Sequence, residues 1–141
     1  MNSKYMKLAI EEAKKSKDSD GYWVGAVIIK DDIIISKSYS CEKNDNGHAE
    51  ELAIKRCKEN ISGATMYITM EPCDIRPSGK KSCCDWIIES KIKKVIYGVL
   101  DPDTYVICNG IEKLVKAGIE VEHFKEFEGE CKRLTPNLKF P

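Results

Sequence analysis

Two runs of mostly β-branched residues, 23–30 and 33–39, are separated only by Asp31 and Asp32. A two-residue connection of turn-forming residues between such runs predicts a tight β-hairpin, in which the second strand returns antiparallel to the first. The first run, WVGAVIIK, is apolar over most of its length. That composition is typical of a buried central strand, so the hairpin predicts a sheet with material packed against it.

Helical and strand patterns alternate along the chain around and after this hairpin. Helices are expected at about 3–16, 48–60, 83–90 and 111–118, and further strands at 65–70, 95–100 and 119–123. The tail from Phe124 to Pro141 gives no clear pattern. This order predicts an α/β fold: a three-layer αβα sandwich with a mixed five-stranded sheet. Residues 1–141 are expected to form it as a single domain.

Charge and cysteine usage narrow the class of protein. Twenty-three basic residues balance 23 acidic ones, which gives no general attraction to nucleic acid or to an anionic membrane. No stretch approaches the roughly 20 apolar residues of a membrane span, and charges interrupt the first segment. Seven cysteines, an odd number, indicate a reducing compartment and a role in packing or metal binding. We therefore expect a cytoplasmic protein that binds neither membrane nor polyanion.

Two short segments carry the residue types of a catalytic zinc site. The tripeptide His-Ala-Glu at 48–50 opens one predicted helix, and Pro-Cys at 72–73 follows a strand, before Cys-Cys at 83–84 opens another helix. One imidazole and two thiolates make three ligands, and a tetrahedral Zn²⁺ with three protein ligands keeps its fourth position for water. Zinc lowers the pKa of that water from about 15.7 toward neutrality and so supplies a nucleophile at physiological pH.

Glu50, two residues after His48, meets a second requirement. Replacing a ring amino group by oxygen needs a group that takes a proton from water and passes protons to the ring nitrogen and the departing ammonia. Zinc deaminases combine His-x-Glu with Pro-Cys-x-x-Cys for this purpose, although here nine residues separate Cys73 from Cys83. A structural zinc site would instead need a fourth protein ligand, for which Cys84 is the nearby candidate.

These residues resemble the cytidine-deaminase-like superfamily over most of the chain, from Trp23 to about Glu120. The segments NGHAEELAI, TMEPCDIRPSGKKSCCDWII and IKKVIYGVLDPDTYVICNGIEKLVKAGIEV are most similar to the deaminase of fungal-type riboflavin biosynthesis. The resemblance implies a cytidine-deaminase-like five-stranded sheet with helices on both faces and Glu50 as proton shuttle. It also implies a zinc site formed by His48, Cys73 and Cys83. It favours Cys83 over Cys84, although Ser82 stands where the family usually has proline.

The same resemblance implies hydrolytic deamination of a phosphorylated ribitylamino-pyrimidine. The loop DIRPSGKKS offers guanidinium, ammonium and hydroxyl groups suited to a phosphate, although solvated loop charges are an equally simple interpretation for any one lysine. Asn46 matches a polar position near the substrate in such enzymes. The expected substrate-binding residues are Asn46, Ala49, Arg76, Ser78, Lys80 and Lys81.

Other functions remain open on sequence grounds. One alternative is a deaminase of deoxycytidylate or another nucleotide or nucleobase, and another acts on a base of tRNA or single-stranded nucleic acid. Neutral net charge counts against the polymer substrate. A zinc-bearing but inactive scaffold would need Glu50 to be missing, and it is present. The superfamily implies a possible homodimer, and any partner enzyme would be a separate chain.

Overall fold

The computed structural model describes residues 1–16, 21–42, 47–103 and 107–141. One sheet has the strand order β2-β1-β3-β4-β5. Its strands are β1 (Gly25–Lys30), β2 (Ile33–Tyr39), β3 (Thr65–Met70), β4 (Lys94–Val99) and β5 (Glu120–His123). Strand β1 pairs antiparallel with β2 and β3, whereas β3, β4 and β5 are parallel. The predicted mixed five-stranded sheet is therefore confirmed.

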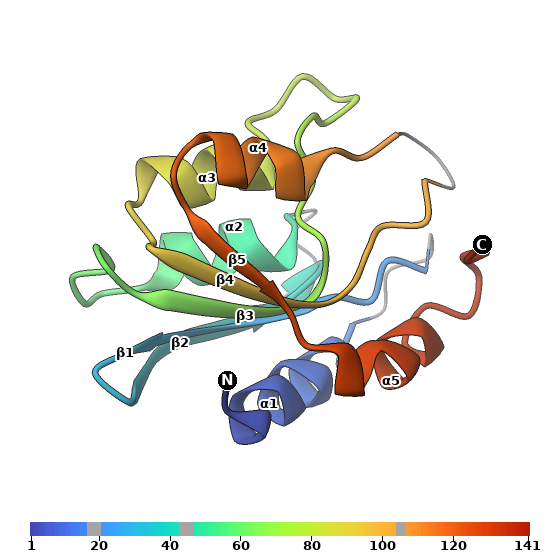
Figure 1. Ribbon diagram of the computed structural model, residues 1–141, viewed down its shortest axis with the longest axis horizontal. Coiled ribbons are helices and arrows are strands. Elements are labelled where there is room, and N and C mark those ends of the chain that lie inside the picture. Colours follow the sequence, from blue (N-terminus) through green and yellow to red (C-terminus); the bar gives the residue numbers. More distant parts are fainter. Residues whose placement is uncertain (17–20, 43–46, 104–106) are drawn as a thin grey trace.

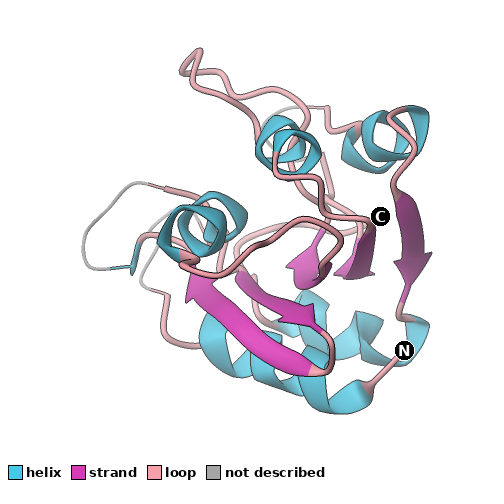
Figure 2. Cartoon of the chain, turned by 90° about the vertical axis from the view of Figure 1, so that its left-hand side faces the viewer, coloured by secondary structure: helices cyan, strands magenta, loops and turns pink. Residues whose placement is uncertain are grey.

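Helices cover both faces of this sheet (Figure 1). On one face lie α2 (Ala49–Arg56), α3 (Cys83–Glu89) and α4 (Gly110–Lys116), and on the other lie α1 (Ser3–Ala13) and α5 (Glu128–Arg133). The turned view in Figure 2 shows the same two helical layers with the strands between them. This is the three-layer αβα sandwich that the alternation of patterns predicted. No helix among the described residues is long and apolar enough to cross a membrane.

The hairpin forms as the sequence indicates. Asp31 and Asp32 both have positive φ, 52° and 60°, which is the left-handed conformation required at both central positions of a type I′ turn. Lys30 therefore pairs directly with Ile33, and the register continues to Gly25 opposite Tyr39, with one irregularity after Ile28. Strand β1, at 0–6% exposure from Ala26 to Ile29, is the buried central strand that its composition predicted.

Helix α1 packs very closely on β1 at Gly25. A Cβ atom there would lie 1.9 Å from the carbonyl oxygen of Ala9 and 2.6 Å from the amide nitrogen of Ala13. Because the obstacle is backbone, Gly25→Ala must displace the helix. We expect it to lower the free energy of unfolding by about 1–3 kcal/mol, as overpacking does. The midpoint of urea unfolding, compared with that of the parent protein, would measure this change. Gly63→Ala is not a suitable control, because Gly63 has a positive φ that strains any other residue.

The C-terminal tail, which gave no pattern in the sequence, completes the core. It forms a short 3₁₀ turn, Lys125–Phe127, and then α5. Phe127 and Cys131 are buried in this segment, and a Cβ at Gly98 of β4 would lie 2.3 Å from the Cys131 sulfur. The tail therefore packs directly on the sheet. Its helix is only 6 residues long, too short for a helical period to show in the sequence.

Candidate active site

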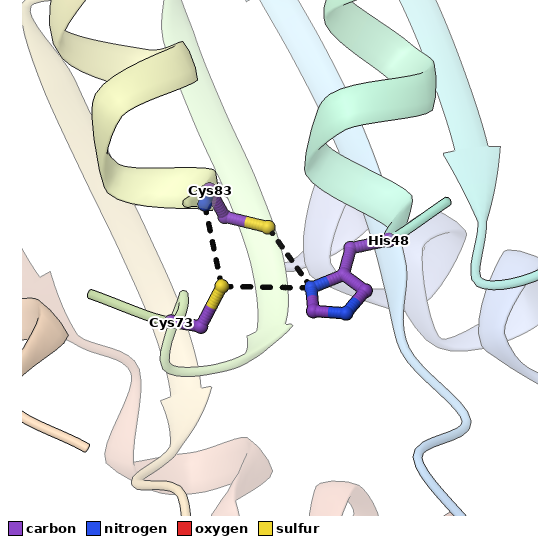
Figure 3. A group of neighbouring side chains, drawn as sticks. All are labelled: His48, Cys73 and Cys83. Carbon is purple, nitrogen blue, oxygen red and sulfur yellow. Dashed lines mark hydrogen bonds between the residues drawn. The ribbon is translucent and has the colours of Figure 1, made fainter. Parts of the chain in front are cut away.

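The predicted metal ligands come from three segments that meet near the end of β3. His48 is the N-cap residue of α2, and Cys83 is the first residue of α3. Cys73 follows β3 by three residues. The hydroxyl of Ser82 accepts a hydrogen bond from the amide of Asp85 and so caps α3 immediately before the ligand. In Figure 3 Cys83, at the start of α3, lies above Cys73, and His48, at the start of α2, lies to the right of both.

The distances among these side chains fit a tetrahedral metal site. Nδ1 of His48 lies 3.2 Å from Sγ of Cys83 and 3.5 Å from Sγ of Cys73 (Figure 3). All three donor atoms lie within 4.8 Å of one another. Zinc–nitrogen and zinc–sulfur bonds of about 2.0 and 2.3 Å at a tetrahedral angle place donor atoms roughly 3.6 Å apart. The donor set and its spacing therefore suit Zn²⁺ with little rearrangement.

The two thiols differ in their electrostatic surroundings. Hydrogen bonding with the Cys83 thiol and with His48 lowers the pKa of Cys73 to about 5, and the Cys83 amide also donates to the Cys73 sulfur at 3.3 Å. Burial raises the pKa of Cys83 well above its usual value. Cys73 is thus the favoured first thiolate, and a cation is needed to stabilise a second one, since metal binding releases ligand protons.

Cys84 is not a member of the ligand group. Its thiol points elsewhere, donating to the carbonyl oxygen of Pro72 at 3.6 Å and to that of Gly110 at 3.4 Å. Burial raises its pKa far above the usual value, so it remains a neutral thiol. Of the two adjacent cysteines, Cys83 has its sulfur facing His48, so Cys83 remains the predicted ligand.

Glu50 lies in the first turn of α2 and is 4% exposed. It lines the same cavity as His48 and Cys73. Burial raises the pKa of its carboxyl group from 4.5 to about 7. A carboxyl group with a pKa near the ambient pH can both accept and release a proton, as general acid–base chemistry requires.

The cavity beside the ligands has a volume of about 310 Å³. Besides His48, Glu50 and Cys73, its walls include three residues that were predicted to bind substrate: Ala49, Arg76 and Ser78. Eight further lining residues were not singled out in the sequence: Tyr22, Val24, Ser40, Met70, Glu71, Ile75, Pro77 and Asp101. A volume of this size suits a single small aromatic ring with short substituents.

Lys80 and Lys81, which were also predicted to bind substrate, are not among the described lining residues of this cavity. Lys80 is exposed, and Lys81 lies over the ring of Trp86, with its ammonium 4.4 Å from the ring centroid and 3.0 Å from a carboxylate oxygen of Glu89. Asn46 lies outside the described residues. That these three residues bind substrate remains a prediction.

Glu71 is a supporting residue that sequence reasoning missed, although it stands in the TMEPC segment. Its carboxylate accepts hydrogen bonds from the amides of Asp101 and Ile111, both at 3.1 Å. It therefore joins the end of β3 to the loop after β4 and to the start of α4. The signal available in the sequence was an acidic residue directly after an apolar strand, next to a ligand cysteine.

Together, this fold and this donor set define a protein with a candidate site for one metal ion, whose one imidazole and two thiols are the ligand types of a catalytic zinc centre. The model of the cytidine and deoxycytidylate deaminase zinc-binding region matches residues 1–99. The chain therefore belongs to the cytidine and deoxycytidylate deaminase family, a family of zinc-dependent hydrolases, and the resemblance seen in the sequence is confirmed.

Three relatives show the range of the similarity. The diaminohydroxyphosphoribosylamino-pyrimidine deaminase of Schizosaccharomyces pombe is 44% identical over 138 residues, 94% of this chain and 34% of that protein. The Thermotoga maritima deaminase/5-amino-6-(5-phosphoribosylamino)uracil reductase is 40% identical, with a TM-score of 0.81 over 94% of this chain and 38% of that one. The Aspergillus oryzae Rib2 deaminase, solved with DARIPP, is 27% identical, with a TM-score of 0.73 over 96% and 98%.

The chain thus spans about one third of the length of the curated relatives it matches. Its likeness to the Aspergillus deaminase extends over nearly the whole of both chains. The similarity therefore concerns the deaminase part of these proteins.

Proposed function

We propose that the protein hydrolyses the ring amino group of a phosphorylated ribitylamino-pyrimidine, releasing ammonia, as a deaminase of riboflavin biosynthesis. The observation that supports this most is the buried Glu50 beside the His48, Cys73 and Cys83 donor set, at the wall of a cavity sized for one ring. The names of the relatives support the wider substrate class, since one is a diaminohydroxyphosphoribosylamino-pyrimidine deaminase and another is a riboflavin biosynthesis protein, and the ribityl form comes from the resemblance seen in the sequence.

The metal ligands and Glu50 have separate roles in this hydrolysis. Zinc bound by His48, Cys73 and Cys83 would supply a Lewis acid that makes water nucleophilic near neutral pH. Glu50 takes the proton of the attacking water and delivers protons to the ring nitrogen and then to the leaving amino group. Ala49, at the start of α2, presents backbone at the cavity wall beside it. The buried position of Glu50 excludes bulk water from these transfers.

The phosphate would lie at the side of the cavity formed by Arg76 and Ser78. A guanidinium and a hydroxyl are suitable donors to phosphate oxygens. The cavity takes one small ring, and the net charge of zero gives no general attraction to a polymer backbone. These features favour a small phosphorylated substrate over a nucleic acid.

Ammonia release by the purified zinc-loaded protein tests this proposal. The panel contains the ribitylaminopyrimidine phosphate, its ribosylamino counterpart, deoxycytidylate, cytidine, and a tRNA or single-stranded DNA. Release from the ribitylaminopyrimidine phosphate in strong preference to the others is expected. Release from deoxycytidylate or from the polymer alone would overturn the substrate while retaining the zinc chemistry, and no release from any of them would overturn the function.

Arg76→Ala is expected to raise KM for the phosphorylated pyrimidine by about tenfold or more, since a charge-assisted hydrogen bond contributes about 1.5–3 kcal/mol. KM for the dephosphorylated form should change much less when both are measured with zinc in excess, which keeps the metal site of the variant filled. Lys7→Ala is the control, because Lys7 is an exposed cation on α1, on the opposite face of the sheet from the cavity. Steady-state ammonia assays with both substrates measure this ratio, and equal effects on the two substrates would remove Arg76 from the phosphate site.

We further propose that the protein works as a homodimer in the cytoplasm. All seven cysteines are free thiols, which agrees with a reducing compartment. Light scattering after size-exclusion chromatography would give the oligomeric state, and a monomer at micromolar concentration would contradict the dimer.

A further inference from the structure

The loop that connects Cys73 to Cys83 is mostly exposed and contains one buried charged side chain. Residues 77–81 and Ile75 are exposed, and Asp74 is partly buried. Arg76 is the buried residue in this stretch, with its side chain 7% exposed. A cationic side chain is the least expected group for that position, since arginine is rarely buried unless it is paired.

Its partner is Glu51 on α2. Nη1 of Arg76 donates to Oε1 of Glu51 at 2.6 Å and also approaches the carbonyl oxygen of Lys81 at 3.4 Å. The Glu51 side chain is 9% exposed, so both charges of the pair are nearly enclosed. The other carboxylate oxygen of Glu51 accepts from Lys55 at 2.6 Å, but Lys55 is 48% exposed. The enclosed contact is therefore the one between α2 and the loop.

The Arg76–Glu51 pair lies between the two segments that carry the predicted metal ligands. Glu51 follows His48 by three residues and stands next to Glu50, whereas Arg76 follows Cys73 by three residues. The carbonyl oxygen that Arg76 also contacts belongs to Lys81, two residues before the second thiol ligand. The pair thus links the segment that carries the histidine and the proton shuttle to the segment that carries both thiols.

We propose that the Arg76–Glu51 ion pair is a positioning device that fixes the long Cys73–Cys83 loop on α2 and so holds the two halves of the metal site in register. This inference deepens the proposed function, on whose zinc site it rests. Neither residue is a metal ligand, and Glu51 acts on the site only through Arg76 and α2.

The length of the loop explains why such a device is needed. Zinc deaminases with the Pro-Cys-x-x-Cys motif place two residues between the thiols, whereas nine residues separate them here. A longer connection has more conformations to lose when its ends are brought together. An enclosed ion pair in the loop removes many of these conformations in advance. Loss of one partner would leave the other charge buried without compensation, so single substitutions should act strongly.

The test uses Glu51→Gln, Arg76→Gln and the double variant, each with a far-UV circular dichroism spectrum like that of the parent protein. Transfer of zinc to a chromogenic chelator is timed for each. We expect release about tenfold faster or more in each single variant, as for other residues that orient metal ligands. The double variant should release zinc much more slowly than the product of the two single effects predicts, because the residues act as one unit. Arg76→Lys should fall between Arg76→Gln and the parent.

Hydrogen exchange of the metal-free protein gives a second readout that does not depend on zinc or substrate. Amides of residues 74–82 should exchange faster in both single variants, whereas Lys55→Ala, which removes the exposed partner of Glu51, should leave them unchanged.

Unchanged exchange and unchanged zinc release in the single variants would overturn the proposal, as would effects that multiply fully in the double variant. If Arg76 only contacts substrate, Glu51→Gln will change neither readout. A parent protein that binds no zinc would overturn the positioning role together with the proposed function, whereas failure of the substrate panel alone leaves this result intact. If Arg76→Gln does not fold, Arg76→Lys and Glu51→Gln decide between these outcomes.

Discussion

Glu50→Gln should nearly abolish ammonia release while leaving zinc bound. The substitution keeps the size of the side chain and its place beside His48 but removes its ability to carry a proton. General acid–base groups contribute about 10²–10⁴-fold to rate, and Glu50 is assigned several of the transfers, so we expect a loss in kcat of about a thousandfold or more. Metal analysis should still give one zinc per chain.

The pH profile gives the same assignment a second readout. If Glu50 must be ionised to accept the proton of water, activity should rise with pH as its carboxyl group ionises, and the midpoint should lie below the pKa of about 7 of the metal-free protein, because the zinc cation favours the carboxylate. The remaining activity of Glu50→Gln should lack that rise. Glu11→Gln is the matched control, because Glu11 lies on α1, on the opposite face of the sheet, and its side chain is 65% exposed. If Glu50→Gln turned over substrate nearly as fast as the parent protein, Glu50 could not be the proton shuttle.

Cys83→Ser should release the metal, whereas Cys84→Ser should retain it. Removing one of three ligands costs a substantial share of a zinc-binding free energy of about 10–16 kcal/mol, so we expect affinity to fall by about a hundredfold or more. Cys84 differs from Cys83 by one position and is equally buried, which makes it a stringent control. Its thiol donates to backbone carbonyl oxygens and not to the ligand set.

Competition with a chelator of known affinity measures both variants, and plasma emission spectrometry gives their zinc content. Cys84→Ser should also lose a little stability, because a buried thiol that donates to two carbonyl groups is replaced by a hydroxyl group in the same place. The reverse result, with zinc lost from Cys84→Ser and kept in Cys83→Ser, would move the ligand by one residue.

The predictable part of this protein is the part that local chemistry determines. The turn at Asp31-Asp32 and the strands Ile33–Tyr39 and Thr65–Met70 were correct to the residue, because turn-forming and β-branched residues mark them directly, whereas the first strand begins at Gly25, two residues later than predicted. The start of α3 at Cys83 was also predicted. The tail from Phe124 onward was not, because its buried residues pack on the far face of the sheet through contacts with β4 that are distant in sequence.

The candidate site divides in the same way. The donor set could be predicted because His-Ala-Glu and Pro-Cys are short motifs with one chemical use, and the structure brings His48, Cys73 and Cys83 together. The surroundings of Arg76 could not, because its partner Glu51 lies 25 residues away and only the fold brings them together. Cavity walls such as Tyr22 and Asp101 carry no motif, so their place emerges only from the tertiary structure.

The exposed stretch from 77 to 81 also matters for protein engineering. These residues leave the core untouched, yet Ser78 reaches the cavity wall. Random residues at positions 77, 78 and 80, with Arg76, Gly79, Lys81 and both flanking cysteines retained, would therefore sample new substrate contacts and keep the positive φ of Gly79 and the ion pair of Lys81 with Glu89. A library of this kind separates selection for new specificity from selection for stability, two demands that usually conflict when active-site residues belong to the core.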